Sequence, residues 1–508
     1  MESGLNNHKL TRRRAVTLMG AAAIAPLPGL EALTSFAFST DKKTHDDLYY
    51  ASLQEVGRRI QSHDLSPVDL TRMMLDRIAK VDPHLKSYAT VMSEQALADA
   101  SAALKEIQAR RYRGPLHGVP IAVKDVFYTT DIRTGLGSSI YAGWQPPFES
   151  TATSRLRAAG AVMLGKLTAT EGVYADHHPT IAPPINPFGA DHWTGTSSSG
   201  SGVAVTAGLA YATLGTDTGG SIRLPSACCG LVGVKPTWGR VSRYGVFPLA
   251  ESLDHVGPMA RSAADAAALL AAIAGPDPAD PTAAGVMVPD YLAEIDGGVA
   301  GLTIGIDWSF LRAKATTEVL DTIATAVSVM TNLGARFVDV TFPETDAILR
   351  GWAVQCAVEA AIAHRETYPA RKAEYGPRLT ALLDRGAAFT GIELGEALQS
   401  RRDFTGRIAR MFDEIDLLLV PALPVAGPTL GHMASLGEDP EAILAIGPFT
   451  APFDVCGYPT ITTPCGANAA GIPIGLQFVG KPFSEALLFR AAHAYQGMTE
   501  WHLRRPTL

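Results

Sequence analysis

Hydrophobic residues recur at helical spacing in the first part of the chain. Leu70, Met74, Ile78 and Val81 lie three or four positions apart and would share one face of a helix. The segment just before them, residues 66–69, supplies a serine that can cap the helix, a proline suited to its first position, and an aspartate near its positive end. This pattern predicts a helix that begins near residue 67.

Apolar runs of strand length and of helix length alternate through the rest of the chain. We expect strands at 119–126, 302–306 and 417–420, and helices at 96–109, 203–214 and 319–333. Such alternation is typical of an α/β protein with a largely buried sheet. The Pro- and Gly-rich segment 275–281 is predicted to be a rigid surface loop. We find no repeat and no long linker, so we expect one large domain over residues 38–508.

The first 37 residues have the character of an export signal. Arg12, Arg13 and Arg14 precede an apolar run at 15–25, which is followed by prolines, a glycine and small residues near Ala37 that offer a cleavage site. The paired arginines favour the twin-arginine route, which predicts a periplasmic or secreted protein. The alternative is a frayed basic N-terminus with a short helix.

Composition excludes several classes of protein. The chain has 508 residues, of which 47% are hydrophobic and 18% are charged, so intrinsic disorder and a coiled coil are excluded. The net charge of -7 and the lack of a long basic run argue against a nucleic-acid partner. No apolar stretch reaches the roughly 18 residues of a membrane-spanning helix, so stable membrane insertion is not expected. The five cysteines show neither a disulfide framework nor zinc-site spacing. Export of an already folded protein would require no disulfides.

Three short segments carry the candidate chemistry: 118–125 (GVPIAVKD), 195–202 (GTSSSGSG) and 215–223 (GTDTGGSIR). A single loop rich in glycine and serine could be a phosphate cradle or simply a tight turn packed near a helix. The glycine patterns of nucleotide-binding loops, G-x-x-x-x-G-K-[ST] and G-x-G-x-x-G after a strand, are not present. Phosphate binding is therefore disfavoured.

Taken together and in this order, the three segments resemble the amidase signature family. The resemblance runs from about residue 65 to about residue 495, and it includes 225–227 (PSA), 233–237 (GVKPT), 449–452 (FTAP), 464–466 (PCG) and 471–477 (GIPIGLQ). It implies the fold of that family, a mixed β-sheet core between layers of helices. It also implies the activity of the family, hydrolysis of a carboxamide C–N bond.

The resemblance further implies a Ser–Ser–Lys triad. Ser221, which follows two glycines, would be the nucleophile, Ser197 the bridging serine and Lys124 the base. An oxyanion needs preorganised donors, and the backbone N–H groups of the loop are the candidates: Thr218, Gly219, Gly220 and Ser221. No cofactor is implied, because amide hydrolysis needs only water.

The chemistry of these residue types is consistent with the roles. A serine hydroxyl needs a neighbouring base, and a lysine can be that base only when it is neutral, although its ordinary pKa is about 10.4. Apolar residues at 121–123 and 126 suggest that Lys124 is buried, which would lower its pKa. Each residue also has a plainer interpretation. Lys124 could pair with Asp125 at the surface, Ser197 could cap the next helix, and Ser221 could be an ordinary turn serine.

Two positions depart from the family pattern. The family commonly has glycine where this chain has Thr196 and Ser199. In the family the bridging serine follows a cis peptide bond, which Thr196 would crowd. The departures remove no reactive group, so the triad stands and the detailed geometry of the loop is left open.

His177 and His178, with Asp176 before them, look at first like a metal pair. Adjacent histidines do not face one ligand position, and no third ligand lies nearby in the sequence, so we expect no metal. A loop beside the substrate channel, or plain surface, is the better interpretation.

Several other residues have an expected place near the site. Tyr174, Phe188 and Trp193 could line the acyl pocket or belong to the core. Asp217 and Arg223 are expected to brace the loop around the nucleophile and not to react.

Three functions remain in competition. The first is an exported amide hydrolase that acts on a small-molecule amide through an acyl-enzyme and is compatible with a homodimer. The second is the amidase subunit of a glutamine-dependent tRNA amidotransferase, which shares these motifs but works in the cytoplasm with partner subunits. The third is a non-enzymatic exported binding protein on the same fold, against which the three intact triad residues argue.

Overall fold

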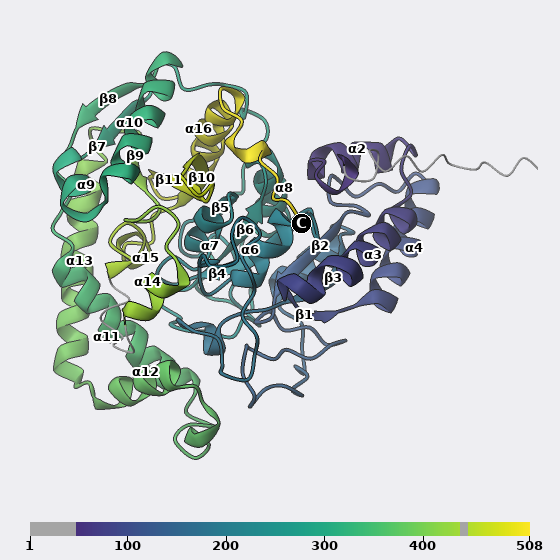
Figure 1. Cartoon of the computed structure of the whole chain (residues 1–508), viewed down its shortest axis with the longest axis horizontal. Helices are drawn as coiled ribbons and strands as arrows, with labels where there is room; N and C mark the ends of the chain where they lie inside the picture. Colours follow the sequence, from purple (N-terminus) through teal and green to yellow (C-terminus); the bar gives the residue numbers. More distant parts are fainter. Residues whose placement is uncertain (1–46, 437–444) are drawn as a thin grey trace, which may run out of the picture.

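The computed structural model describes residues 47–436 and 445–508 (Figure 1). The predicted export signal, residues 1–37, lies outside the described residues. In the described part, no helix is both long and apolar enough to cross a membrane.

One mixed sheet of 11 strands runs through the molecule, in the order β1-β3-β2-β4-β6-β5-β10-β11-β9-β7-β8. The strands are β1 Tyr88–Val91, β2 Pro120–Lys124, β3 Val162–Leu167, β4 Ala212–Asp217, β5 Val232–Lys235, β6 His255–Ala260, β7 Thr303–Ile306, β8 Arg336–Asp339, β9 Leu417–Pro421, β10 Thr460–Ala467 and β11 Pro473–Gly480. β2 is parallel to β3 and β4, and β7 is parallel to β8 and β9, whereas the other pairs are antiparallel. Every residue of β2, β3 and β4 is buried, as expected for strands that are covered on both faces.

Helices flank this sheet, with α2 to α4 at one end of the molecule and α10 to α13 at the other (Figure 1). Their bounds are α2 Leu53–Gln61, α3 Pro67–Leu85, α4 Ser93–Gln108, α5 Thr151–Ala158, α6 Ser199–Thr206, α7 Arg223–Cys228, α8 Ala263–Ile273, α9 Trp308–Lys314, α10 Thr317–Asn332, α11 Asp346–Ala363, α12 Pro377–Ala388, α13 Gly391–Met411, α14 Leu430–Ser435, α15 Ala451–Val455 and α16 Glu485–Gly497. The predicted α/β fold, a mixed sheet between helices in one large domain, is confirmed.

Most of the elements that the sequence predicts lie close to their predicted positions. Ser66 caps α3 by accepting a hydrogen bond from the backbone N–H of Asp69, and the side chains of Leu70, Met74 and Ile78 are buried beneath the helix. α4, α10, β2, β7 and β9 also fall within the predicted segments or within three residues of them.

The helix predicted over 203–214 is wrong in its second half. α6 ends at Thr206, Gly208 takes a left-handed conformation with φ of 67°, and the chain continues as strand β4 from Ala212. Gly208 ends the helix because glycine adopts positive φ without steric cost. The continuous apolar run concealed the change, since a buried helix and a buried strand have the same hydrophobicity.

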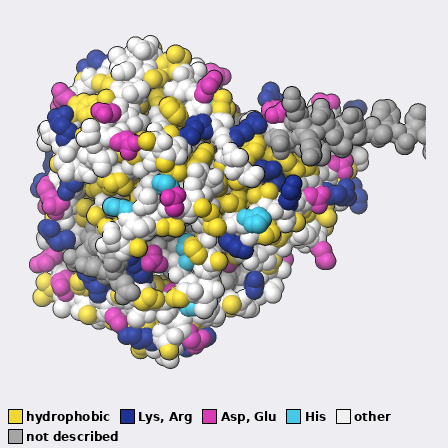
Figure 2. Space-filling model, in the orientation of Figure 1, with side chains coloured by type: hydrophobic (Ala, Val, Ile, Leu, Met, Phe, Trp, Pro, Cys, Tyr) yellow, Lys and Arg dark blue, Asp and Glu magenta, His cyan; other side chains and the backbone are white. Residues whose placement is uncertain are grey.

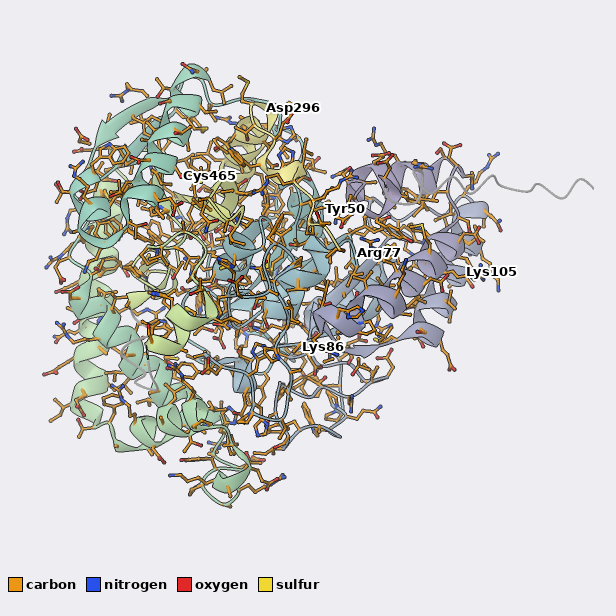
Figure 3. All side chains as sticks on the ribbon, in the orientation of Figure 1. Tyr50, Arg77, Lys86, Lys105, Asp296 and Cys465 are labelled. Atoms are coloured by element: carbon orange, nitrogen blue, oxygen red, sulfur yellow. The ribbon has the colours of Figure 1, made fainter. Side chains whose placement is uncertain are left out.

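The start of the described chain is fixed to the body by aromatic and arginine side chains. Tyr50 and Arg77 lie together where the N-terminal helices meet the central sheet, and Arg77 Nη2 donates to the Tyr50 hydroxyl over 3.2 Å (Figure 3). Arg505, near the other end of the chain, lies 4.8 Å from the centre of the Tyr50 ring. Both ends of the described chain therefore meet at this site.

Acidic and basic side chains are interspersed on the face shown in Figure 2.

All five cysteines are free thiols, and four of them are buried.

Candidate active site

Lys124 is the last residue of β2, and its side chain is completely buried. Its Nζ atom lies 2.6 Å from Ser197 Oγ and 2.9 Å from Thr216 Oγ1. Asp125 turns to a different lysine, Lys166, with an oxygen 3.2 Å from its Nζ. The plainer interpretation of Lys124 as a surface lysine paired with Asp125 is therefore wrong.

The surroundings of Lys124 favour its neutral form. Burial away from water lowers its pKa from an ordinary 10.5 to about 7, and the negative charges of Asp254 and Asp217 oppose this only in part. Asp217 is itself paired with Arg223, which reduces its effect on Lys124. A substantial fraction of Lys124 is therefore neutral near pH 7, as a general base requires.

Residues 195–202, here called the serine loop, lie between β3 and β4 in the sequence and reach Lys124 through Ser197. Ser197 follows a cis peptide bond after Thr196, as the family pattern implies, and threonine is accommodated there. The Ser197 hydroxyl contacts Lys124 and does not cap α6. The backbone N–H of Ser198 donates to the carbonyl of Ser221 over 3.3 Å, which holds the serine loop beside the Ser221 loop.

Asp217 and Arg223 hold the Ser221 loop (residues 215–223) in place, as expected. Arg223 Nη2 and Nε donate to the two Asp217 carboxylate oxygens over 2.8 and 3.0 Å. The backbone N–H of Ile222 donates to the same carboxylate over 2.9 Å. The paired Arg223 keeps the pKa of Asp217 far below its usual range, although burial acts in the opposite direction. Ser221 itself is partly exposed.

One of the four candidate oxyanion donors is already occupied. The backbone N–H of Gly220 donates to Asp217 Oδ1 over 2.6 Å, so of the four predicted donors it is the one with a partner among the described residues. Gly220 contributes to the brace, because one N–H cannot point well at both a carboxylate and a substrate oxygen. The N–H groups of Gly219 and Ser221 make no hydrogen bond with the described residues. Together with Thr218 they remain as candidates.

Trp352 of α11 packs directly on this loop and was not singled out from the sequence. Its indole N–H donates to the carbonyl of Thr218 over 2.7 Å. A Cβ atom at Gly219 would lie 2.6 Å from Cζ2 of Trp352, so only glycine lets the backbone approach the ring this closely. Trp352 comes from a helix more than 130 residues further on, and no local pattern marks it.

A buried network of charged and polar groups lies behind the loop, and the sequence analysis missed it too. Arg223 also pairs with Asp454 of α15, and His255 Nδ1 lies 3.4 Å from that carboxylate. Lys235 Nζ lies 3.2 Å from His255 Nε2. Burial holds the pKa of His255 well below its usual range, so this histidine stays neutral beside Lys235.

Asp254 is a buried carboxylate whose negative charge acts on Lys124. Its carboxylate accepts hydrogen bonds from the Thr218 hydroxyl over 2.5 Å and from the backbone N–H of Leu249 over 2.9 Å. Burial raises its pKa to about 7, against the effect of these donors. Burial therefore favours the neutral form of both Lys124 and Asp254.

A cavity of about 480 Å³ opens beside this site and borders Thr196 and Gly219. Its apolar wall includes Trp193, Leu224 and Trp352. Of the three predicted pocket aromatics, Trp193 lines the cavity, whereas Tyr174 and Phe188 do not border it. A larger cavity of about 620 Å³ lies along α3 and β1. None of the three predicted triad residues lines either cavity, but only the smaller one borders their near chain neighbours Thr196 and Gly219.

His177 and His178 both border the cavity near the site but turn to different partners. His177 Nε2 lies 3.0 Å from Ser199 Oγ, whereas His178 contacts the Thr180 hydroxyl and the Glu374 carbonyl. They do not converge as metal ligands would. Within residues 47–436 and 445–508, no group of three His, Cys, Asp or Glu side chains could hold a metal ion.

Comparison with known proteins shows the family to which this chain belongs. The family model described as amidase matches residues 69–489. The chain is 46% identical over 467 residues to amidase AmiD of Mycobacterium tuberculosis, which covers 91% of this chain and 97% of that protein. It is 37% identical to a subunit of the glutamyl-tRNA(Gln) amidotransferase of Geobacter metallireducens, covering 90% of this chain and 99% of that protein.

Solved structures agree. The peptide amidase of Stenotrophomonas maltophilia superposes with a TM-score of 0.77 at 31% identity, over 90% of this chain and 98% of that one. A bacterial aryl acylamidase superposes with a TM-score of 0.80 at 23% identity, over 90% and 98%, which supports the fold. The chain belongs to the amidase signature family, and it is an amidase.

Proposed function

We propose that this chain hydrolyses a small-molecule carboxamide through a serine acyl-enzyme, with Ser221 as nucleophile, Ser197 as proton relay and Lys124 as base. The observation that carries the proposal is the 2.6 Å contact between Lys124 Nζ and Ser197 Oγ in a fully buried setting. Burial supplies a neutral amine near pH 7, and the short contact gives that amine a path to the serine loop.

The reaction divides into two halves that use the same groups. In the first, Ser221 Oγ attacks the amide carbon while its proton passes through Ser197 to Lys124. The N–H groups of Thr218, Gly219 and Ser221 receive the oxyanion. The C–N bond then breaks as the proton returns through Ser197 to the leaving amine. In the second half, water attacks the Ser221 ester by the same relay, and the carboxylic acid leaves.

A hydrolase that works without partner subunits is favoured over a component of an amidotransferase. The identity to amidase AmiD is 46%, whereas the identity to the amidotransferase subunits is 36–37%. The amidotransferase alternative predicts glutaminase activity that depends on partner subunits and tRNA. A purified chain that hydrolyses carboxamides alone, as a monomer or a homodimer by light scattering, would contradict it.

The experiment that tests the proposal labels and then removes the nucleophile. Phenylmethanesulfonyl fluoride should attach to Ser221, as read by peptide mass mapping, and Ser221→Ala should abolish amide hydrolysis while the circular dichroism spectrum is unchanged. A label on another residue, or substantial hydrolysis by the Ser221→Ala variant, would overturn the assignment. A third alternative, a non-enzymatic binding protein, predicts no labelling at all.

We also propose that the enzyme is exported folded through the twin-arginine route. The support is the sequence of residues 1–37, with Arg12, Arg13 and Arg14 ahead of a modest apolar run. Replacing the three arginines by lysine should leave active, unprocessed enzyme in the cytoplasm, because the two basic residues differ in geometry. The exported wild-type protein should begin near Phe38 or Thr40. Uncleaved wild-type protein in the cytosol of the native host would refute export.

A further inference from the structure

The Ser199 side chain, one of the two departures from the family pattern, has a definite partner. Ser199 is completely buried at the start of α6, two residues after the proposed relay serine. Its hydroxyl lies 3.0 Å from Nε2 of His177, and a glycine at this position would leave that ring nitrogen without this contact. The serine at position 199, where the family commonly has glycine, therefore has His177 as its partner.

His177 is held in place from both sides of its loop. The preceding Asp176 accepts a hydrogen bond from Arg378 Nε over 2.8 Å, and the following His178 contacts the Glu374 carbonyl over 3.1 Å. With the ring itself tethered to Ser199, the direction of the imidazole is fixed. Fixed polar groups in a binding cavity give specificity, because a substrate that fails to match them leaves them unpaired.

The imidazole is neutral and has one ring nitrogen to offer. Burial lowers the pKa of His177 to about 4, so at pH 7 one nitrogen donates a hydrogen bond and the other accepts one. Nε2 is engaged by Ser199, and Nδ1 makes no hydrogen bond with the described residues. His177 borders the same cavity as Thr196 and Gly219, which places it in the chamber beside the reacting groups.

Several other polar side chains at the cavity already have partners, whereas Arg378 Nη1 and the Thr196 hydroxyl have none among the described residues. Arg378 and Asp176 bind each other, His178 uses both ring nitrogens, and His192 contacts Asp191 at the outside. Much of the remaining wall is apolar, with Trp193, Leu224, Trp352 and Ile446 each less than a tenth exposed. His177 thus presents an available polar atom in a largely apolar chamber.

We propose that His177, oriented by Ser199, is a specificity-determining residue that hydrogen-bonds a polar substituent on the substrate. The favoured substrates are aryl or similarly apolar carboxamides that carry one hydroxyl or amino group. The inference rests on the proposed function for the identity of the reacting site. Beyond that function, it predicts that the enzyme prefers a substituted amide to the unsubstituted one.

The test compares phenylacetamide with its 2-, 3- and 4-hydroxy and amino derivatives. For the wild type, at least one derivative should have a kcat/KM about tenfold above that of phenylacetamide, the worth of one good hydrogen bond. His177→Phe, which keeps a ring and removes its nitrogens, should abolish that ratio. Ser199→Ala should reduce the ratio several-fold, and adding it to His177→Phe should change nothing more.

The matched control is Ser201→Ala. Ser201 lies two positions further along α6, is equally buried, and its hydroxyl donates to the Leu214 carbonyl away from the cavity. This variant should leave the substrate ratio as in the wild type. A ratio that His177→Phe leaves intact, or a wild type that prefers no derivative, overturns the inference.

A binding readout separates this inference from the proposed function. Isothermal titration of the Ser221→Ala variant with the same series should show the same preference, and adding His177→Phe should remove it. If the preference appears in binding while the wild type hydrolyses nothing, the proposed function fails and the role of His177 stands. If hydrolysis proceeds through Ser221 without the preference, only the inference about His177 fails.

Discussion

Lys124 and Lys166 lie on neighbouring parallel strands, are equally buried, and have quite different partners. Lys166 Nζ has an Asp125 carboxylate oxygen at 3.2 Å and the Phe127 carbonyl at 2.7 Å. Lys124 Nζ contacts two hydroxyls, those of Ser197 and Thr216, and no carboxylate of the described residues. The strand register pairs Lys124 with Leu167 and Lys166 with Val123, so the two side chains point to opposite faces of the sheet.

The comparison shows that burial alone does not make a base. Burial lowers the pKa of both lysines, but Asp125 beside Lys166 favours its charged form. Lys166 therefore has the partners of a structural cation that ties β3 to the segment after β2. Lys124 lacks such a counter-charge in direct contact and faces the serine loop, which suits proton transfer.

Loss of the proposed base should have the largest effect. Lys124→Met should lower kcat by about two to four orders of magnitude, the usual worth of a positioned general base. Lys124→Arg should not restore the rate, because a guanidinium stays protonated. Steady-state kinetics on any hydrolysed amide checks both variants. A Lys124→Arg variant with a near wild-type rate would place the base elsewhere.

Lys166→Met should act on stability instead. Removing one partner of a buried ion pair leaves the Asp125 charge uncompensated, which typically costs about 3–5 kcal/mol. Urea unfolding followed by circular dichroism should show this loss. The matched variant Lys124→Met should lose less, since no carboxylate is left bare. Equal losses in the two variants would contradict the assignment of Lys166 as a structural cation and of Lys124 as the base.

The pH dependence of stability should report the protonation state of Lys124. The pKa of Lys124 is about 7 in the folded chain and 10.5 when exposed, so the unfolded state binds more protons between these values. The contribution of Lys124 to the free energy of unfolding therefore rises with pH from about 7 to about 10.5. Lys124→Met should flatten that rise, measured by urea unfolding at several pH values. An unchanged slope would mean that Lys124 is charged when folded.

Asp254→Asn should shift the pH profile of activity by a smaller amount. The negative charge of Asp254 favours the ammonium form of Lys124, so removing it lowers the pKa of Lys124. The acidic limb of kcat/KM, expected near pH 7 in the wild type, should move to lower pH by about one unit, equivalent to about 1.4 kcal/mol. Asparagine still offers an oxygen to the Thr218 hydroxyl. A profile that does not move would show that Asp254 has no electrostatic influence on the base.

The smallest effect is expected at Trp352, which touches the loop and neither lysine. Trp352→Phe keeps an aromatic ring against Gly219 but removes the indole N–H that binds the Thr218 carbonyl. The loss of one buried hydrogen bond is worth about 1–3 kcal/mol. We expect kcat to fall by up to about tenfold with the pH profile unchanged. A shifted pH profile would show that the loop, and not only the buried charges, sets the pKa of Lys124.

Local patterns in the sequence predicted several of the elements and the candidate reacting side chains. Ser66 begins α3 because a serine oxygen can accept a hydrogen bond from a nearby N–H, and this interaction spans three residues. The segments around Lys124, Ser197 and Ser221 are equally short, so each can be read as a unit. The error over 203–214 arose where a single apolar run serves two elements, and there the break at Gly208 depends on how the run packs.

Tertiary structure alone decided which partner each candidate reacting group meets. Lys124 and Asp125 are neighbours in sequence, yet the end of β2 sends one to Ser197 and the other to Lys166. Trp352 reaches the Ser221 loop from α11, and Ser199 meets His177 across the cavity wall. These contacts join residues 22 to 134 positions apart. A pKa depends on burial and on the nearest charges, and both are fixed only when distant segments pack together.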